Sequence, residues 1–125
     1  LQPYAARLPG LVLHAFAASE PLVQTFMAQG AFFSVGGALC NPGARRVQAA
    51  AAAIPLDRLL LETDAPDMLP RGGLPIASPP APPGLNQPAN LPRVARALAA
   101  LKGLDEAAVA AATGRQARRV YGVSD

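Results

Sequence analysis

The chain has 125 residues, of which 51% are hydrophobic and 15% are charged, and its formal net charge is +3 at pH 7. This length allows one domain with a modest core, and the composition argues against extensive disorder. No apolar run approaches the roughly 20 residues of a membrane helix, and the single cysteine, Cys40, excludes an internal disulfide and favours a reducing compartment, so we expect a cytoplasmic protein without a membrane span.

The first half of the chain alternates between strand-like and helix-like patterns. Five segments carry them in turn: GLVLHAF (10–16), ASEPLVQTFMAQG (18–30), AFFSVGG (31–37), ARRVQAAAAAI (44–54) and PLDRLLLETD (55–64). In the first strand, Val12, His14 and Phe16 are expected on one face. The order strand–helix–strand–helix–strand, with short connections, predicts right-handed crossovers and a parallel sheet.

The second half begins with a long loop, residues 67–88, which contains seven of the 14 prolines. A loop of this length is usually functional or disordered. Three helices are predicted after it, at 91–101, 106–112 and 114–121, and Asp105 is expected to cap the second of them.

Ionisable side chains follow two of the predicted strands. The run LLLETDAP (59–66) ends a strand covered on both faces with Glu62 and Asp64, and His14, the only histidine, stands at the end of the first strand. Parallel strands present these ends on one side of the sheet, so His14 and Asp64 are candidate metal ligands or a base and its orienting partner. The alternatives are a core histidine for His14 and a helix cap for Asp64.

Four further residues have more than one interpretation, namely Glu62, Gly36, Gly37 and Asn86. Glu62 is expected to be a buried hydrogen-bond acceptor for a neighbouring strand or loop rather than a ligand. Gly36 and Gly37 either let the backbone approach another group closely or form a strand-end turn. Asn86 either directs its amide toward a site mouth or belongs to a turn. The mildly basic charge is compatible with a phosphate-bearing substrate.

Several motifs, in this order, resemble the C-terminal half of the TatD-type metal-dependent deoxyribonucleases, and the YjjV-like branch in particular. They are GLVLHAFAAS, FFSVGG, IPLDRLLLETDAPDM, NQPANLP and the ending ARRVYG. The resemblance implies an α/β fold in which residues 1–125 are the C-terminal part of one TIM (β/α)8 barrel domain, with strands six to eight, the terminal helices and the proline-rich loop at 67–88.

The resemblance also implies roles for single residues. His14 matches a histidine that binds a divalent metal or the scissile phosphate, and Asp64 matches an aspartate that contacts metal and orients or deprotonates the attacking water. Glu62 matches a structural neighbour of that aspartate, and Asn86 falls where the family lines its substrate mouth. The implied cofactor is a divalent metal (Zn, Mg or Mn), and the implied partner is DNA or another phosphodiester.

The chain departs from the family pattern. The family's H-x-H on strand one, glutamate on strand four and histidine on strand five are absent, and the loop carries IASPPAPPG where a basic patch is common. Three hypotheses therefore stand: a metal-dependent DNA phosphodiesterase, a barrel hydrolase with another substrate, or a non-catalytic α/β fragment that associates with itself or with a missing N-terminal half through open sheet edges. We expect the 125-residue piece alone to be inactive.

Overall fold

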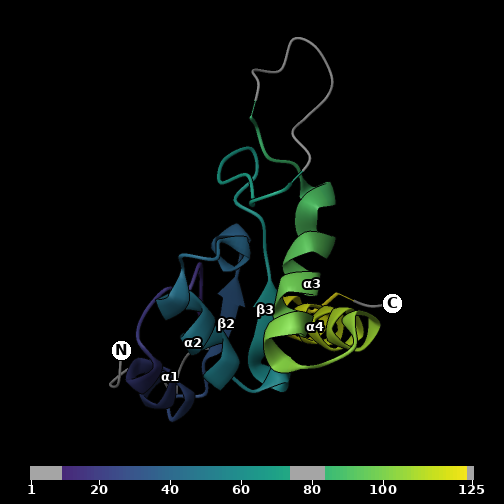
Figure 1. Ribbon diagram of the computed structural model, residues 1–125. Helices are drawn as coiled ribbons and strands as arrows, with labels where there is room; N and C mark the ends of the chain where they lie inside the picture. Colours follow the sequence, from purple (N-terminus) through teal and green to yellow (C-terminus); the bar gives the residue numbers. More distant parts are fainter. Residues whose placement is uncertain (1–9, 74–83, 124–125) are drawn as a thin grey trace.

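The fold is built on a three-stranded parallel sheet. The computed structural model describes residues 10–73 and 84–123, and Figure 1 shows the chain. The strands are β1 (Val12–Leu13), β2 (Phe32–Val35) and β3 (Leu59–Leu61), in the spatial order β1-β2-β3. Phe32 pairs with Val12, and Phe33 pairs with Leu13 on one side and with Leu59 on the other. The predicted α/β class and parallel sheet are confirmed.

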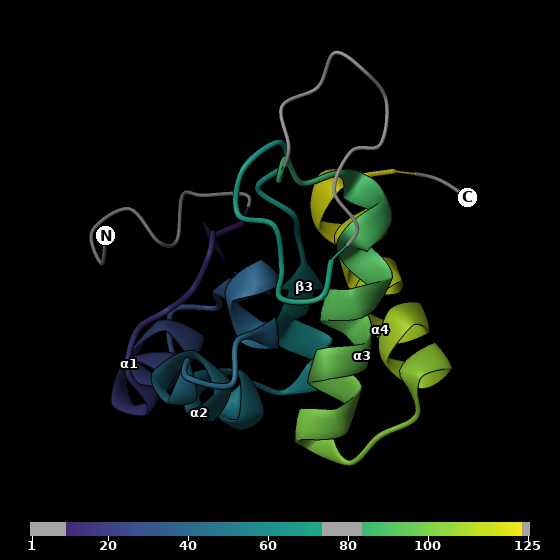
Figure 2. The same cartoon turned by 45° about the horizontal axis from the view of Figure 1, so that its top comes forward.

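Four α-helices pack around this sheet. They are α1 (Glu20–Met27), α2 (Arg45–Ala53), α3 (Leu91–Lys102) and α4 (Glu106–Tyr121). In Figure 1 α1 and α2 lie beside β2, and in both views α3 and α4 lie beside β3 (Figures 1 and 2). Short 3-10 turns are η2 (Gly37–Cys40), η3 (Leu56–Arg58) and η4 (Pro88–Asn90).

One core cluster joins the sheet to all four helices. Its largest fully buried side chains are Val23, Phe33, Val35, Ile54, Leu59, Val94, Leu98 and Val109. Because these residues come from β2, β3, α1, α3, α4 and the end of α2, their burial fixes the sheet against the helices and leaves the carboxyl ends of the strands in defined positions. Leu59 and Leu60 are both buried, which confirms the prediction that this strand is covered on both faces.

The first strand is shorter than predicted, and Phe16 does not share a face with Val12 and His14. Ala15 has a φ of 47°, so the chain leaves the extended conformation directly after His14. Phe16 consequently turns into the helix-covered core, where its ring packs edge-on against Phe33 with centroids 4.9 Å apart. The predicted alternation of side chains between the two faces of the strand is therefore wrong from Ala15 onward.

Two predicted boundaries were also wrong. The segments 106–112 and 114–121 form one continuous helix, α4, because Gly114 inside it costs only about 1 kcal/mol while Val109, Ala112 and Thr113 are buried. Asp105 does cap this helix, since its carboxylate accepts from the Ala108 N–H at 3.0 Å. Residues 56–58, predicted as strand, form η3.

Part of the predicted proline-rich loop, residues 74–83, lies outside the described residues. In the part of the chain that the structure describes, no helix combines the length and the apolarity needed to cross a membrane.

Candidate metal centre

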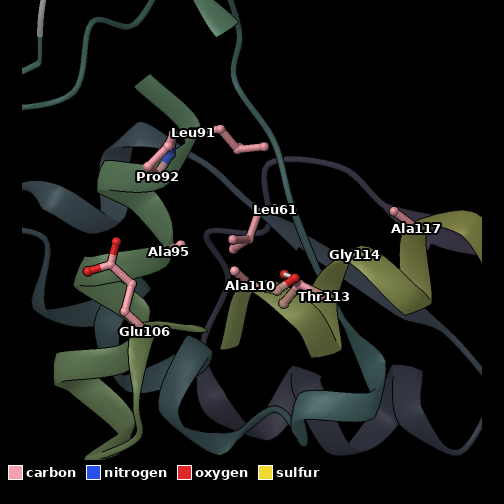
Figure 3. Close-up of a pocket in the computed structure, with 9 residues that line it drawn as sticks. All are labelled: Leu61, Leu91, Pro92, Ala95, Glu106, Ala110, Thr113, Gly114 and Ala117. Atoms are coloured by element: carbon pink, nitrogen blue, oxygen red, sulfur yellow. Dashed lines mark hydrogen bonds between the residues drawn. The ribbon is translucent and has the colours of Figure 1, made fainter. Parts of the chain in front are cut away.

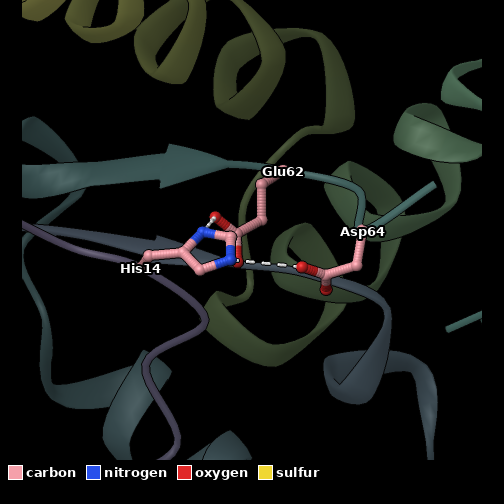
Figure 4. A group of neighbouring side chains, drawn as sticks. All are labelled: His14, Glu62 and Asp64. Carbon is pink, nitrogen blue, oxygen red and sulfur yellow. Dashed lines mark hydrogen bonds and ion pairs between the residues drawn. The ribbon is translucent and has the colours of Figure 1, made fainter. Parts of the chain in front are cut away.

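Three ionisable side chains meet at the carboxyl ends of β1 and β3. His14 directly follows β1, Glu62 directly follows β3, and Asp64 lies two residues further along. Each offers one ligand atom, and these atoms lie within 4.8 Å of one another. Figure 4 shows the imidazole between the two carboxylates. The structure thus brings together the histidine and the aspartate that the sequence singled out.

The imidazole contacts a different acid through each nitrogen. His14 Nε2 lies 3.2 Å from Asp64 Oδ1, and His14 Nδ1 lies 2.6 Å from Glu62 Oε2. The side chain of His14 is 69% exposed, whereas those of Glu62 and Asp64 are 14% and 21% exposed. The cluster is therefore open to solvent on the histidine side and partly enclosed on the carboxylate side.

Glu62 receives hydrogen bonds from two neighbouring elements besides His14. The Ala15 N–H donates to Oε1 at 2.8 Å, and the Ser34 hydroxyl of β2 donates to Oε2. The Glu62 N–H continues the sheet ladder to the Val35 carbonyl at 3.1 Å. This is the acceptor arrangement predicted for Glu62. Ser34 was not singled out from the sequence. The signal that could have identified it is that it is the one polar residue of an otherwise apolar strand.

Gly36 makes room for the cluster at the end of the middle strand. A Cβ atom at this position would lie 3.3 Å from Glu62 Cγ and 3.5 Å from Asp64 Oδ2. At Gly37 a Cβ atom would lie 2.9 Å from the Met68 carbonyl oxygen, closer than real Cβ atoms approach. The predicted close backbone approach at Gly36 and Gly37 is confirmed, because both positions face other chain segments directly.

Asn86 is not brought into the cluster. It is 1% exposed, its amide donates to the Met68 carbonyl at 3.3 Å, and its oxygen accepts from Asn90 Nδ2 at 2.9 Å and from the Gln87 N–H. The amide therefore ties the segment after Asp64 to the start of α3. Of the two interpretations that the sequence left open for Asn86, these local hydrogen bonds favour the turn, and a contact of Asn86 with substrate stays a prediction.

The donor set suits a divalent cation. An imidazole nitrogen and carboxylate oxygens are ligands for Zn²⁺ or Mn²⁺, and carboxylates also serve Mg²⁺. His14 Nε2 and Asp64 Oδ1 lie 3.2 Å apart. If both bound one ion with bonds of about 2.1 Å, the angle between the two bonds would be about 100°, which lies between the octahedral and tetrahedral angles. A catalytic zinc site has three protein ligands, so this pair forms one side of a complete site.

An apolar hollow of about 240 Å³ lies between β3, α3 and α4 (Figure 3). Its lining includes Leu61, Leu91, Pro92, Ala95, Ala110 and Ala117. The one ionisable residue of this lining, Glu106, is paired with Arg96 at 2.9 Å. The hollow therefore lacks the groups that hydrolysis requires, and the candidate site remains the His14, Glu62 and Asp64 cluster.

Comparison with known proteins gives a consistent match. The family model described as TatD related DNase matches residues 1–122. The chain is 36% identical over 122 residues to the "3'-5' ssDNA/RNA exonuclease TatD" of Erwinia tasmaniensis, which covers 97% of this chain and 46% of that protein. The Escherichia coli K12 protein of the same name is 34% identical over 127 residues, again with 46% of its length covered. The chain thus spans about half the length of these curated relatives.

Two solved structures share the fold. The structure of YJJV, a TatD homolog from Escherichia coli K12, superposes with a TM-score of 0.76 at 31% identity and covers 90% of this chain and 40% of that one. A hydrolase of the TatD family from Entamoeba histolytica gives a TM-score of 0.73 at 18% identity, with 90% of this chain and 42% of that chain covered. The second likeness concerns the fold alone.

Proposed function

Because the chain belongs to the TatD related DNase family, we propose that it is part of a divalent-metal-dependent hydrolase that cleaves phosphodiester bonds in DNA. The observation that carries this proposal is the contact of 3.2 Å between His14 Nε2 and Asp64 Oδ1 at the carboxyl ends of parallel strands. Catalytic groups of α/β enzymes gather at these ends.

We propose further that β1, β2 and β3 are strands six, seven and eight of a (β/α)8 barrel, with residues 1–125 as its C-terminal portion. The sequential strand order and the helices between the strands support this assignment. The chain covers 46% of the curated relatives, so the remaining metal ligands would come from elsewhere in a complete barrel. Catalysis is therefore proposed for the complete protein.

In this proposal His14 and Asp64 hold the metal, and Asp64 also serves as the general base. A bound divalent metal would polarise a phosphate oxygen and lower the pKa of a coordinated water. Asp64 has a second carboxylate oxygen, Oδ2, beside Gly36, and this oxygen is available to accept a proton. Asn86 contributes indirectly, because it holds the Met68 carbonyl and with it the chain that follows Asp64.

The substrate class follows from the relatives. They are named 3'-5' ssDNA/RNA exonucleases, so we propose single-stranded DNA as the first substrate to test and RNA as the second. The net charge of +3 is compatible with a phosphate-bearing substrate. A cytoplasmic location stays a prediction.

The test uses a full-length protein that contains this segment. It is freed of metal, supplied with Mg²⁺, Mn²⁺ or Zn²⁺ in turn, and incubated with single-stranded DNA labelled at either end. We expect metal-dependent release of nucleotides that a chelator stops and that His14→Ala reduces at least tenfold. Gln24→Ala, on the exposed face of α1, is the control and should retain full activity. Chelator-insensitive cleavage, or full activity of His14→Ala, would refute the proposal.

A second candidate function is association without catalysis. In the described residues β3 pairs only with β2, and the apolar hollow beside Leu61 lies at this side of the sheet. We propose that the segment packing against this hollow is the part of a complete barrel that corresponds to the uncovered portion of the curated relatives. Light scattering of the 125-residue chain at micromolar concentration should then show dimers or larger species, whereas a monodisperse monomer with a cooperative melt would contradict this reading.

A further inference from the structure

Three hydrogen-bond donors converge on the carboxylate of Glu62. Two of them, the Ala15 N–H and the Ser34 hydroxyl, are donors in either tautomer of His14, and the third is His14 Nδ1 when the ring hydrogen lies on that nitrogen. Ser34 is only 3% exposed, and the Ala15 N–H belongs to the main chain, so neither donor can move far. These two donors hold the carboxylate in one orientation. In this orientation Oε2 also faces the imidazole of His14.

The two contacts of the imidazole differ in kind. A carboxylate is only an acceptor, so the contact of 2.6 Å between Nδ1 and Glu62 Oε2 requires a hydrogen on Nδ1. Two ligand atoms at this separation would also subtend only about 75° at one metal ion with bonds of about 2.1 Å, which is too narrow for neighbouring ligands. Glu62 and Nδ1 therefore form a hydrogen-bonded pair and do not share an ion.

The opposite nitrogen has the complementary property. A neutral imidazole carries one N–H, so a hydrogen on Nδ1 leaves Nε2 with a lone pair. That lone pair lies 3.2 Å from Asp64 Oδ1, which is also an acceptor. Two acceptors facing each other favour a cation between them.

We propose that Glu62, anchored by Ser34 and the Ala15 N–H, is a positioning residue that holds His14 as the Nδ1–H tautomer and presents Nε2 beside Asp64. This inference rests on the proposed metal site and adds the way in which one of its ligands is prepared. Hydrogen bonds from a ligating histidine to a carboxylate fix its ring orientation and its basicity. Ser34 acts one step further away, because its hydroxyl orients Glu62.

The single histidine makes the tautomer directly measurable. In the ¹⁵N-labelled 125-residue chain without metal, long-range ¹H–¹⁵N correlation spectra contain one imidazole. The pH is raised until its signals stop changing, so that the neutral form is observed. We expect a pyrrole-type Nδ1 and a pyridine-type Nε2, in a ratio of at least about tenfold over the other tautomer, since hydrogen bonds to charged groups are the strong ones.

Glu62→Gln should invert this tautomer. The amide oxygen must face the fixed Ala15 N–H, so the amide nitrogen faces His14 and donates to Nδ1, which moves the imidazole hydrogen to Nε2. Glu106→Gln is the matched control, because Glu106 is also a paired carboxylate but lies at the start of α4. It should leave the tautomer unchanged.

Ser34→Ala should give a mixture of both tautomers, and Ser34→Thr, which keeps a hydroxyl, should restore the wild-type ratio. Ser19→Ala is its control, because Ser19 makes no side-chain cap bond to α1. Backbone amide spectra establish that each variant is folded, and the wild-type spectrum alone is already decisive. An Nε2–H tautomer in the wild type, or an unchanged tautomer in Glu62→Gln, would overturn the inference, and a wild-type ratio in Ser34→Ala would remove Ser34 from it.

The failure of this inference can be told apart from failure of the proposed function. The tautomer is measured without metal, so it does not depend on catalysis. A full-length protein that binds no divalent metal would refute the proposed function and leave the tautomer result standing. Metal binding that requires His14, combined with an Nε2–H tautomer in the free chain, would refute the positioning role alone.

Discussion

Replacement of Asp64 by asparagine should separate catalysis from folding. The amide keeps the shape of the side chain but loses its charge and its basicity. In the structure the Asp64 carboxylate pairs with His14 at 3.2 Å, and the two side chains are 21% and 69% exposed. A contact between ionisable groups this open to solvent contributes only about 0 to 1 kcal/mol even when both groups are charged, so we expect the free energy of unfolding to change by no more than about 1 kcal/mol.

The effect on catalysis should be far larger. General-base catalysis typically contributes a factor of about 10² to 10⁴, which corresponds to about 3 to 5 kcal/mol of activation free energy at about 1.4 kcal/mol per tenfold. Loss of a metal ligand would add to this. In a full-length protein that contains this segment, Asp64→Asn should therefore reduce cleavage of single-stranded DNA at least about a hundredfold while urea unfolding remains nearly unchanged.

The assay compares initial rates of nucleotide release at saturating metal, together with urea unfolding curves of the same preparations. Asp57→Asn is the control, because Asp57 is an exposed aspartate at the opposite, amino end of β3. It should keep both activity and stability. Retention of most of the turnover by Asp64→Asn, or an equal loss in Asp57→Asn, would refute the reasoning and favour a purely structural role for Asp64.

Three further changes test the surroundings of the site. Gly36→Ala places a methyl group 3.3 Å from Glu62 Cγ and 3.5 Å from Asp64 Oδ2. The metal affinity of the full-length protein, measured by calorimetry, should therefore fall several-fold. An unchanged affinity would contradict the close approach. Burial raises the pKa of the Cys40 thiol, so its alkylation by iodoacetamide should be slower than in the urea-unfolded chain and should accelerate only at higher pH; equal rates would contradict this burial. Lys102 donates to two carbonyls at the end of α2 at 3.0 and 2.7 Å, so Lys102→Met should lower the free energy of unfolding by about 1 to 2 kcal/mol in urea titrations, whereas an unchanged midpoint would show that water replaces the ammonium group.

The sequence predicted the parallel sheet and the meeting of His14 with Asp64 because both follow from periodicity and from the direction of parallel strands. It failed at Phe16, where a positive φ at Ala15 reverses the side-chain alternation. Period-two patterns presuppose extended backbone, and an alanine gives no sign of leaving it. It also divided α4 between residues 112 and 114, whereas Val109, Ala112 and Thr113 are buried together within one continuous helix.

The site itself shows the same limit. Glu62 was recognised as an acceptor, but the convergence of Ser34 and the Ala15 N–H on it depends on the register between β2 and β3 and on the turn after β1. Neither is encoded within one segment. The burial of Asn86 could not be predicted for a similar reason, since it arises from contacts with Met68 and Asn90 on both sides of a long connection.

The hydrogen bonds of Asn86 bear on how this connection can vary in length. Its N–H donates to the Pro66 carbonyl at 2.7 Å and its side chain to the Met68 carbonyl, so the two ends of the connection are joined next to Asp64. The proline-rich residues 74–83 fall between these joined ends. Closing a connection of twice the length costs only about 0.6 kcal/mol. Insertions and deletions between Gly73 and Gly84 are therefore expected to be tolerated without displacing Asp64, which leaves the length of this stretch free to vary while the candidate metal centre keeps its arrangement.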